Sequence, residues 1–142
     1  MPQPPAVWWP KPEAGDIVWC HFPHLPNLDP RPKPRPALVV TVSEHEHVPR
    51  AYRAFVAYGT SQKTMALHKG EFLLTKDQSS AFQLSGLGFD TKFNFAKSVE
   101  LDCFGDWFKV LQSQKNATTP KIGVLHSIYA KAAYAAYSAI HP

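Results

Sequence analysis

The sequence predicts a mainly β fold, a small and strongly bent antiparallel barrel closed by one helix at the C-terminus. Short apolar runs rich in β-branched and aromatic residues alternate with turn signals through most of the chain. Alanine and other helix formers are concentrated near the C-terminus. The 142 residues, of which 44% are hydrophobic, suit one domain with a substantial core, and a charged fraction of only 18% excludes a disordered polyelectrolyte.

We divide the chain into a proline-rich arm, residues 1–14, and a barrel domain, residues 15–142. Proline favours an extended path in the arm. Trp8 and Trp9 are costly to leave in water, so we expect the arm to lie against the domain, with a recognition arm as the alternative. No apolar run reaches the length of a membrane span, and the first residues lack the apolar core of a signal peptide. Two cysteines are too few for a disulfide scaffold, and we expect a cytoplasmic protein with no membrane partner.

The stretch Gly15–Val40 organises the barrel. Its first strand, Asp16–Phe22, is apolar on both faces, as expected for a strand that is covered on both sides. The loop 23–36 that follows is basic and rich in proline, which has no amide donor for a central ladder. Long ordered loops tend to be functional, and arginine suits phosphate oxygens because its planar guanidinium is always charged. The net charge of +4 modestly favours an anionic partner.

The other elements follow from apolar runs between turn signals and from helical spacing. A hydroxyl-rich tract, Gly59–Thr64, comes directly after the third strand. We predict a helix over 119–140, with Thr119 as its N-cap and Pro120 at its first helical position. The later strands are expected at Ala37–Val42, Tyr52–Tyr58, Glu71–Thr75 and Phe93–Leu101, with a short last strand within 104–112.

Four pieces of the chain resemble, in order, the MazF/PemK family of toxin endoribonucleases. GDIVWCHF and RPALVV resemble the two strands that open that family around a loop, YGTSQKT resembles its Thr/Ser-rich segment, and FAKSVELD resembles its Lys-Ser-apolar-acidic strand. The closing helix matches too, and the resemblance covers Gly15–Ile140, with 64–92 aligning loosely. The chain departs from the family in its extra arm, in the longer proline-rich loop 23–36, and at His21, where the family has an acidic or small residue.

The resemblance implies an SH3-like barrel, a homodimer, a cognate antitoxin, and cleavage of single-stranded RNA that needs no metal or other cofactor. It also implies that Arg35 and Thr60 are the catalytic arginine and threonine. As the titrating group we favour His24, in the loop, over His21, because a loop residue reaches a ligand more easily. Cationic side chains near these residues suit flanking phosphates. The expected substrate-binding residues are Arg31, Lys33, Ser61, Gln62 and Lys63.

Each of these residues also has a structural alternative. Arg35 can pair with Asp16 or Asp29 at the rim of the barrel, and Thr60 can simply cap a turn. His24 can be a solvated loop histidine. The loop cations can serve solubility alone.

Three alternatives concern the site and the whole protein. His45 and His47, with two neighbouring glutamates, can hold a metal, but we favour a solvated hairpin tip and expect no metal site. A barrel that has lost catalysis can act as a protein- or nucleic-acid-binding module, since a fold does not determine a function. A gyrase-inhibiting toxin of the same general fold is the third alternative.

Overall fold

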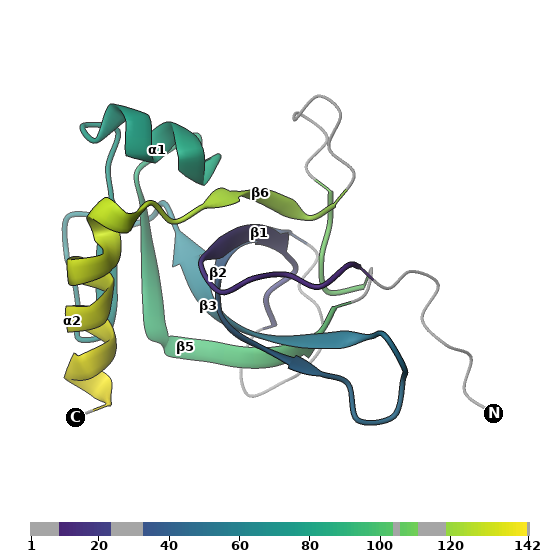
Figure 1. Cartoon of the computed structure of the whole chain (residues 1–142). Coiled ribbons are helices and arrows are strands. Elements are labelled where there is room, and N and C mark those ends of the chain that lie inside the picture. Colours follow the sequence, from purple (N-terminus) through teal and green to yellow (C-terminus); the bar gives the residue numbers. More distant parts are fainter. Residues whose placement is uncertain (1–8, 24–32, 104–105, 111–118, 142) are drawn as a thin grey trace.

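The computed structural model describes residues 9–23, 33–103, 106–110 and 119–141. Six antiparallel strands form one curled, half-barrel sheet with a helix at the C-terminus (Figure 1), so the predicted mainly β fold with a closing helix is confirmed. The strand order is β4-β5-β3-β2-β1-β6. The strands are β1 (Asp16–Cys20), β2 (Arg35–Glu44), β3 (Tyr52–Thr60), β4 (Glu71–Leu74), β5 (Thr91–Asp102) and β6 (Lys121–Val124), and the helices are α1 (Ser79–Ser85), the 3-10 turn η1 (Ser127–Tyr129) and α2 (Ala130–Ile140).

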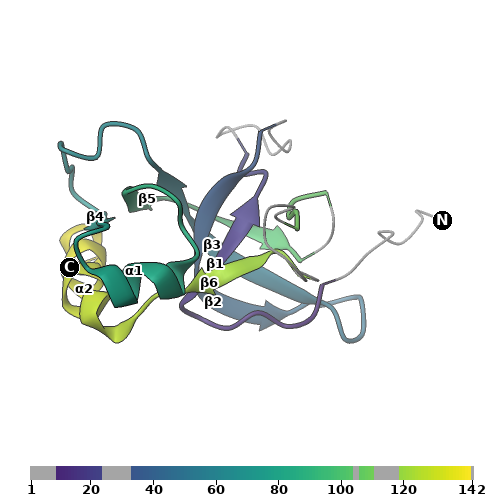
Figure 2. The same cartoon turned by 90° about the horizontal axis from the view of Figure 1, so that it is seen from above.

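The sheet separates two apolar cores, as expected for strands with two apolar faces. Alternation along β1 sends Ile17 to one core and both Val18 and Cys20 to the other. Helices α1 and α2 lie together on one side of the molecule (Figure 2). The helix-side core contains Ile17, Leu38, Phe72, Leu74, Phe82, Phe93, Phe95 and Ala136, and the arm-side core contains Val18, Cys20, Phe22, Ala37, Val39, Val56, Leu101 and Phe108.

The predicted helix over 119–140 is wrong in its first part. Lys121–Val124 forms the edge strand β6, which pairs with β1. Thr119 accepts the backbone N–H of Lys121 at 3.3 Å in a turn before this strand, and the N-cap of the η1 turn is His126. Lys121–Val124 has only four residues, and so short a segment shows too little periodicity to separate strand from helix. Its pairing with the free edge of β1 makes it a strand.

Two further predictions need correction. The segment 104–112 contains no strand among its described residues, and Phe108 makes only an isolated bridge with Cys20. The helix α1 was not predicted at all, because a seven-residue helix gives a weak periodic signal. It ends at Gly86, which takes the left-handed conformation with φ 72°.

Strands β2 and β3 are longer than their apolar runs. The predicted Ala37–Val42 strand extends to Arg35–Glu44, and the predicted Tyr52–Tyr58 strand extends to Thr60. Arg35 and Thr60 therefore belong to the sheet and not to the adjoining loops. Ladder pairing with their neighbours continues beyond the last apolar side chain, which a hydrophobic pattern does not reveal.

The described part of the N-terminal arm lies against the barrel. Trp9 packs on the arm-side core, and its backbone N–H donates to the carbonyl oxygen of Cys103 at 2.8 Å. Trp8 lies outside the described residues. Within the described ranges, no helix is both long and apolar enough to cross a membrane.

Candidate functional site

Arg35 and Thr60 lie on neighbouring strands at one end of the sheet. Arg35 is the first residue of β2, and Thr60 is the last residue of β3. These strands are antiparallel and pair as far as Ala37 and Tyr58, and Arg35 and Thr60 lie two residues beyond that pair in their own strands. Arg35 lies two residues from Ala37, and Thr60 lies two residues from Tyr58, and both of these neighbours belong to the arm-side core. Residues two apart in a strand share a face, so the half-buried Arg35 and Thr60 are on the arm-side face of the sheet.

A close approach at Gly59 keeps the two strands together at this end. A Cβ added there would lie 2.6 Å from the carbonyl oxygen of Pro36 and 2.7 Å from the Phe93 ring. Only glycine allows the backbone of β3 to pass so near to β2. The residue after it, Thr60, is thereby held beside β2.

The hydroxyl of Thr60 has a defined structural role. Its Oγ1 accepts the backbone N–H of Gln62 at 3.0 Å, which is the turn-capping role considered as the alternative. A hydroxyl that accepts one hydrogen bond still carries its own proton and a second lone pair. Thr60 can therefore cap the turn and donate to a ligand at the same time.

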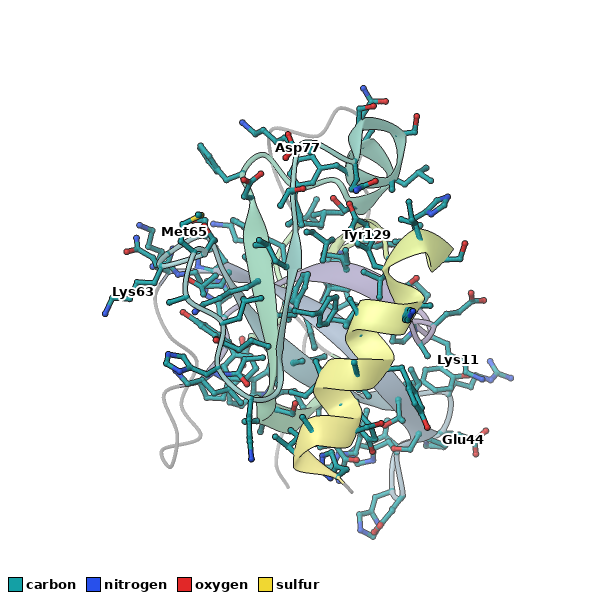
Figure 3. The ribbon with its side chains drawn as sticks, turned by 90° about the vertical axis from the view of Figure 1, so that its left-hand side faces the viewer. Lys11, Glu44, Lys63, Met65, Asp77 and Tyr129 are labelled. Atoms are coloured by element: carbon teal, nitrogen blue, oxygen red, sulfur yellow. The ribbon has the colours of Figure 1, made fainter. Side chains whose placement is uncertain are left out.

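Exposed polar side chains surround the pair. Lys33 precedes Arg35 by two residues, and Ser61, Gln62 and Lys63 follow Thr60 directly; all four are exposed. Figure 3 shows Lys63 projecting from one side of the molecule, on the opposite side from Lys11. The backbone of Lys63 takes a left-handed conformation with φ 51°, which is common in turns.

The proposed ion pair between Arg35 and Asp16 is wrong. Cys20 of β1 is opposite Arg35, whereas Asp16 lies four residues earlier in β1 and pairs with Lys121 at 3.3 Å. Among the residues that the structure describes, no carboxylate lies within ion-pair distance of Arg35, and Asp29 is outside that set. The guanidinium therefore contributes a charge that no described carboxylate neutralises.

A buried ion pair lies beside Thr60 in the next strand. Lys92 of β5 is opposite Thr60, and its Nζ lies 3.1 Å from Oε1 of Glu71. The side chains of Lys92 and Glu71 are only 7% and 5% exposed. The Nζ also donates to the carbonyl oxygen of Ala66 at 2.9 Å, and the same glutamate oxygen accepts the backbone N–H of His68 at 2.6 Å. The pair therefore ties the loop after Thr60 to the sheet.

An aromatic side chain also belongs to this face. Tyr58 precedes Thr60 by two residues, its ring lies edge-on to Phe22 with 5.2 Å between centroids, and Nζ of Lys97 lies 5.6 Å from the ring centroid. Sequence reasoning did not single out Tyr58 or Lys97. The signal was present for Tyr58, because residues two apart in a strand share a face. Lys97 lies across a bulge in β5, which only the register reveals.

The proposed titrating groups are only partly placed. His24 and Arg31 lie outside the described residues. His21 follows Cys20, the residue opposite Arg35, and its backbone N–H donates to Trp107 at 2.7 Å. His21 is thus at the same end of the sheet as Arg35.

The two histidines of the β2–β3 hairpin serve the turn itself. Nδ1 of His45 accepts the backbone N–H groups of His47 and Val48 at 3.1 and 3.0 Å, and its Nε2 lies 3.7 Å from Asp102. The imidazole of His47 is largely exposed. No group of three or more potential metal ligands occurs within the described ranges.

Comparison with known proteins identifies no relative of this chain. The sequence matches no protein-family model, and the search of curated proteins returns no match.

The site combines a half-buried arginine at the start of β2 with a threonine hydroxyl at the end of β3, and lysines lie at the same end of the sheet. Such a set can bind a phosphate and stabilise negative charge that builds up on it.

Proposed function

We propose that this chain is a MazF/PemK-like toxin of a type II toxin–antitoxin system, a cytoplasmic endoribonuclease that cuts single-stranded RNA without a metal. The observation that carries the proposal is that Arg35 begins β2 and Thr60 ends β3, so the two residues lie at the same end of antiparallel neighbouring strands, each two residues beyond the pair Ala37 and Tyr58. The order of the four sequence pieces supports the family assignment. A homodimer and a cognate antitoxin are the partners that this family implies.

In the proposed reaction, the 2′-hydroxyl oxygen of RNA attacks the adjacent phosphorus. The 2′-hydroxyl gives up its proton, the bond between O2′ and phosphorus forms, the bond between phosphorus and O5′ breaks, and the leaving O5′ takes up a proton. Arg35 supplies charge and two parallel donors to the phosphate oxygens. Thr60 donates its hydroxyl proton to a non-bridging oxygen while it accepts from Gln62. His24 is the proposed proton-transfer group, with His21 as its alternative.

The exposed cations at this end are proposed to hold the RNA strand on both sides of the cut. Lys33, Lys63 and Arg31 would each neutralise one phosphate and release counterions. For single-stranded RNA, each lost phosphate contact makes the slope of log binding constant against log salt concentration less negative by about 0.7. Lys63→Ala should thus weaken RNA binding at low salt and reduce its salt dependence, and an unchanged slope would remove Lys63 from the interface.

The central test is cleavage of mixed RNA in excess chelator, followed by mapping of the cut ends. Arg35→Ala should lower the rate by about 100-fold or more, the scale seen when one preorganised donor is lost. The matched control is Arg50→Asn, which also removes one positive charge. Arg50 is exposed in the β2–β3 hairpin, at the other end of these strands, and asparagine tolerates its left-handed backbone with φ 64°.

Two variants of Thr60 separate its roles. Thr60→Ser retains the hydroxyl and the turn bond, so its rate should stay close to that of the wild type. Thr60→Ala should lose less activity than Arg35→Ala, because a neutral donor contributes less than a charged one. Equal rates for the wild type and folded Arg35→Ala would remove Arg35 from the mechanism. If neither cuts any RNA tried, the binding module becomes the better proposal.

A further inference from the structure

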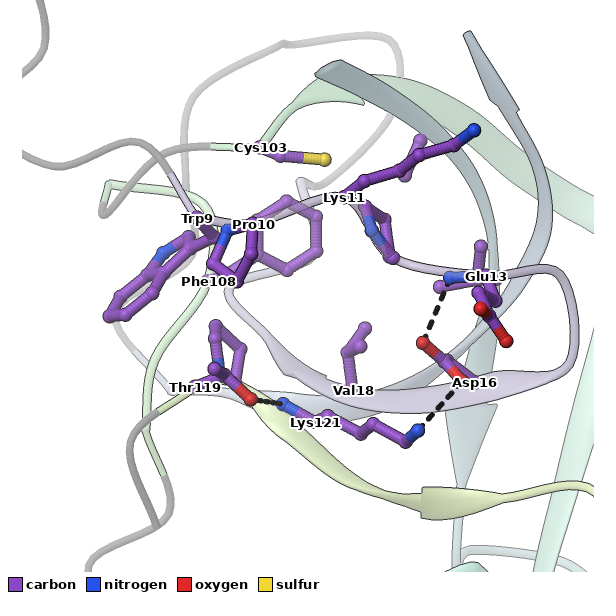
Figure 4. Close-up of a pocket in the computed structure, with 14 residues that line it drawn as sticks. Trp9, Pro10, Lys11, Glu13, Asp16, Val18, Cys103, Phe108, Thr119 and Lys121 are labelled. Atoms are coloured by element: carbon purple, nitrogen blue, oxygen red, sulfur yellow. Dashed lines mark hydrogen bonds and ion pairs between the residues drawn. The ribbon is translucent and has the colours of Figure 1, made fainter. Parts of the chain in front are cut away.

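A cavity of about 280 Å³ lies between residues 9–13 and the sheet (Figure 4). Val18, Val39 and Ala54, from β1, β2 and β3, form part of its lining. An engineered apolar cavity of about 150 Å³ holds benzene, so this one has room for a ring with a substituent. Small-molecule sites in proteins are mostly apolar and contain a few polar groups that fix the orientation of the ligand.

The apolar part of the lining consists largely of aromatic and proline rings. Trp9, Pro10, Phe108 and Pro120 line the cavity, and the hydrogen bond from Trp9 to Cys103 anchors the segment that covers it. The indole Nε1 of Trp9 is buried and has no acceptor among the described residues. A buried N–H without a partner costs free energy, which an acceptor or the π-face of a bound molecule would recover.

The polar part of the lining comprises Lys11, Glu13, Thr119, Lys121 and one buried carboxylate, that of Asp16. The side chain of Asp16 is 7% exposed, and its two oxygens are shared between the backbone N–H of Glu13 at 2.9 Å and Nζ of Lys121 at 3.3 Å. A carboxylate offers about four acceptor positions, so two remain. Lys121 is 46% exposed, and its ammonium can return to water at little cost. The other lysine of the lining, Lys11, extends its ammonium away from Asp16 in Figure 4 and lies 5.9 Å from the Tyr52 ring.

We propose that this cavity binds a small planar aromatic molecule that carries a positively charged N–H donor, such as an aromatic amidine. The ring lies among Trp9, Phe108 and the prolines, and the charged nitrogen donates to Asp16 in place of Lys121. An anionic ligand is disfavoured, because it would meet the buried carboxylate. The faces of the aromatic rings of Trp9 and Phe108 also attract a cation, because the ring quadrupole is negative there.

This site is separate from the Arg35 end of the barrel. Val39 lies four residues from Arg35 in β2, which is roughly 13 Å at strand spacing. The buried side chain of Ala37, on the same face of β2, lies between the two places. The proposal therefore does not depend on ribonuclease activity, and either can fail without the other.

Benzamidine is the probe for the whole chain, titrated by calorimetry and by tryptophan fluorescence, with benzoate as the matched anion. Saturable binding of benzamidine, and none of benzoate, is expected. Asp16→Asn should weaken binding about 10-fold or more, the loss expected for one charge-assisted hydrogen bond. Asp77→Asn is the control for lost negative charge, since Asp77 is exposed and is not part of the cavity lining, and it should leave binding unchanged; Figure 3 shows it well away from the lining residue Lys11.

Lys121→Met gives a test of opposite sign. It removes the cation that competes for Asp16 from a half-exposed position, so benzamidine should bind more tightly than to the wild type. This variant decides the matter even if Asp16→Asn does not fold. No saturable binding of benzamidine to the wild type, equal binding of benzoate, or weaker binding to Lys121→Met would each overturn the proposal.

Discussion

The buried pair of Lys92 and Glu71 makes a sharp prediction about stability. In Lys92→Met the apolar stem is kept and the charge is removed. Glu71, 5% exposed, is then left with the backbone N–H of His68 as its remaining described partner, and the carbonyl of Ala66 loses its donor. Removal of one partner from a buried ion pair costs about 3–5 kcal/mol, because the other charge stays buried without compensation.

That loss is large enough to measure in two ways. At about 3 °C per kcal/mol for a chain of this size, the midpoint of thermal unfolding should fall by roughly 10–15 °C. Urea unfolding followed by circular dichroism should show the same loss as a lower midpoint with an unchanged slope. The slope matters because it tells a change in stability from a change in the unfolded state.

Two controls separate the ion pair from simple loss of a side chain. The double variant Lys92→Met with Glu71→Leu removes both charges and should recover most of the stability, since apolar replacement of a whole buried pair is often close to neutral. Lys97→Met removes an exposed lysine from the same strand, together with its contact with the Tyr58 ring, and should change the unfolding free energy by no more than about 1 kcal/mol. A loss below about 1 kcal/mol for Lys92→Met, as at a surface pair, would refute the reasoning, and so would a double variant as unstable as the single one.

Three other predictions concern packing, thiol chemistry and assembly. Gly123→Ala should lower the unfolding free energy by about 1–3 kcal/mol or more, because its methyl group would collide with the backbone of α1, whereas Gly88→Ala has open space and should be neutral in the same urea titration. Native Cys103 and Cys20 should resist a thiol reagent at pH 8, because thiols that stay protonated do not react. Burial raises the pKa of Cys103 to about 12, with the nearby Asp102 carboxylate as a second cause, and burial raises the pKa of Cys20 further. Stability should then decline from pH 9 towards pH 12 by up to about 1.4 kcal/mol per pH unit for each thiol, since only the unfolded thiols ionise there, and rapid labelling of native protein would contradict this. Light scattering should give a dimer at micromolar concentration, and a monomer would count against the family assignment.

The local pattern of the sequence was sufficient for the strands β1 to β5 and for the two faces of β1. Strand β1 alternates between two apolar sets, and the structure sends Ile17 to one core and Val18 to the other. Period-two alternation and turn residues are local properties, so they can be read without knowledge of the partner strands. The same local pattern placed Arg35 and Thr60 beside the ends of adjacent strands.

Tertiary structure decided the features that depend on distant partners. The edge strand β6 exists because β1 offers it a ladder, and four residues alone do not distinguish that strand from the start of a helix. The buried pair of Lys92 and Glu71 joins residues 21 positions apart, and neither residue carries a local signal of burial. The cavity beneath residues 9–13 likewise depends on how the arm crosses three strands. These features depend on contacts between residues far apart in the sequence. A periodic pattern indicates which face of a helix or strand is apolar, but it does not indicate which other segment covers that face.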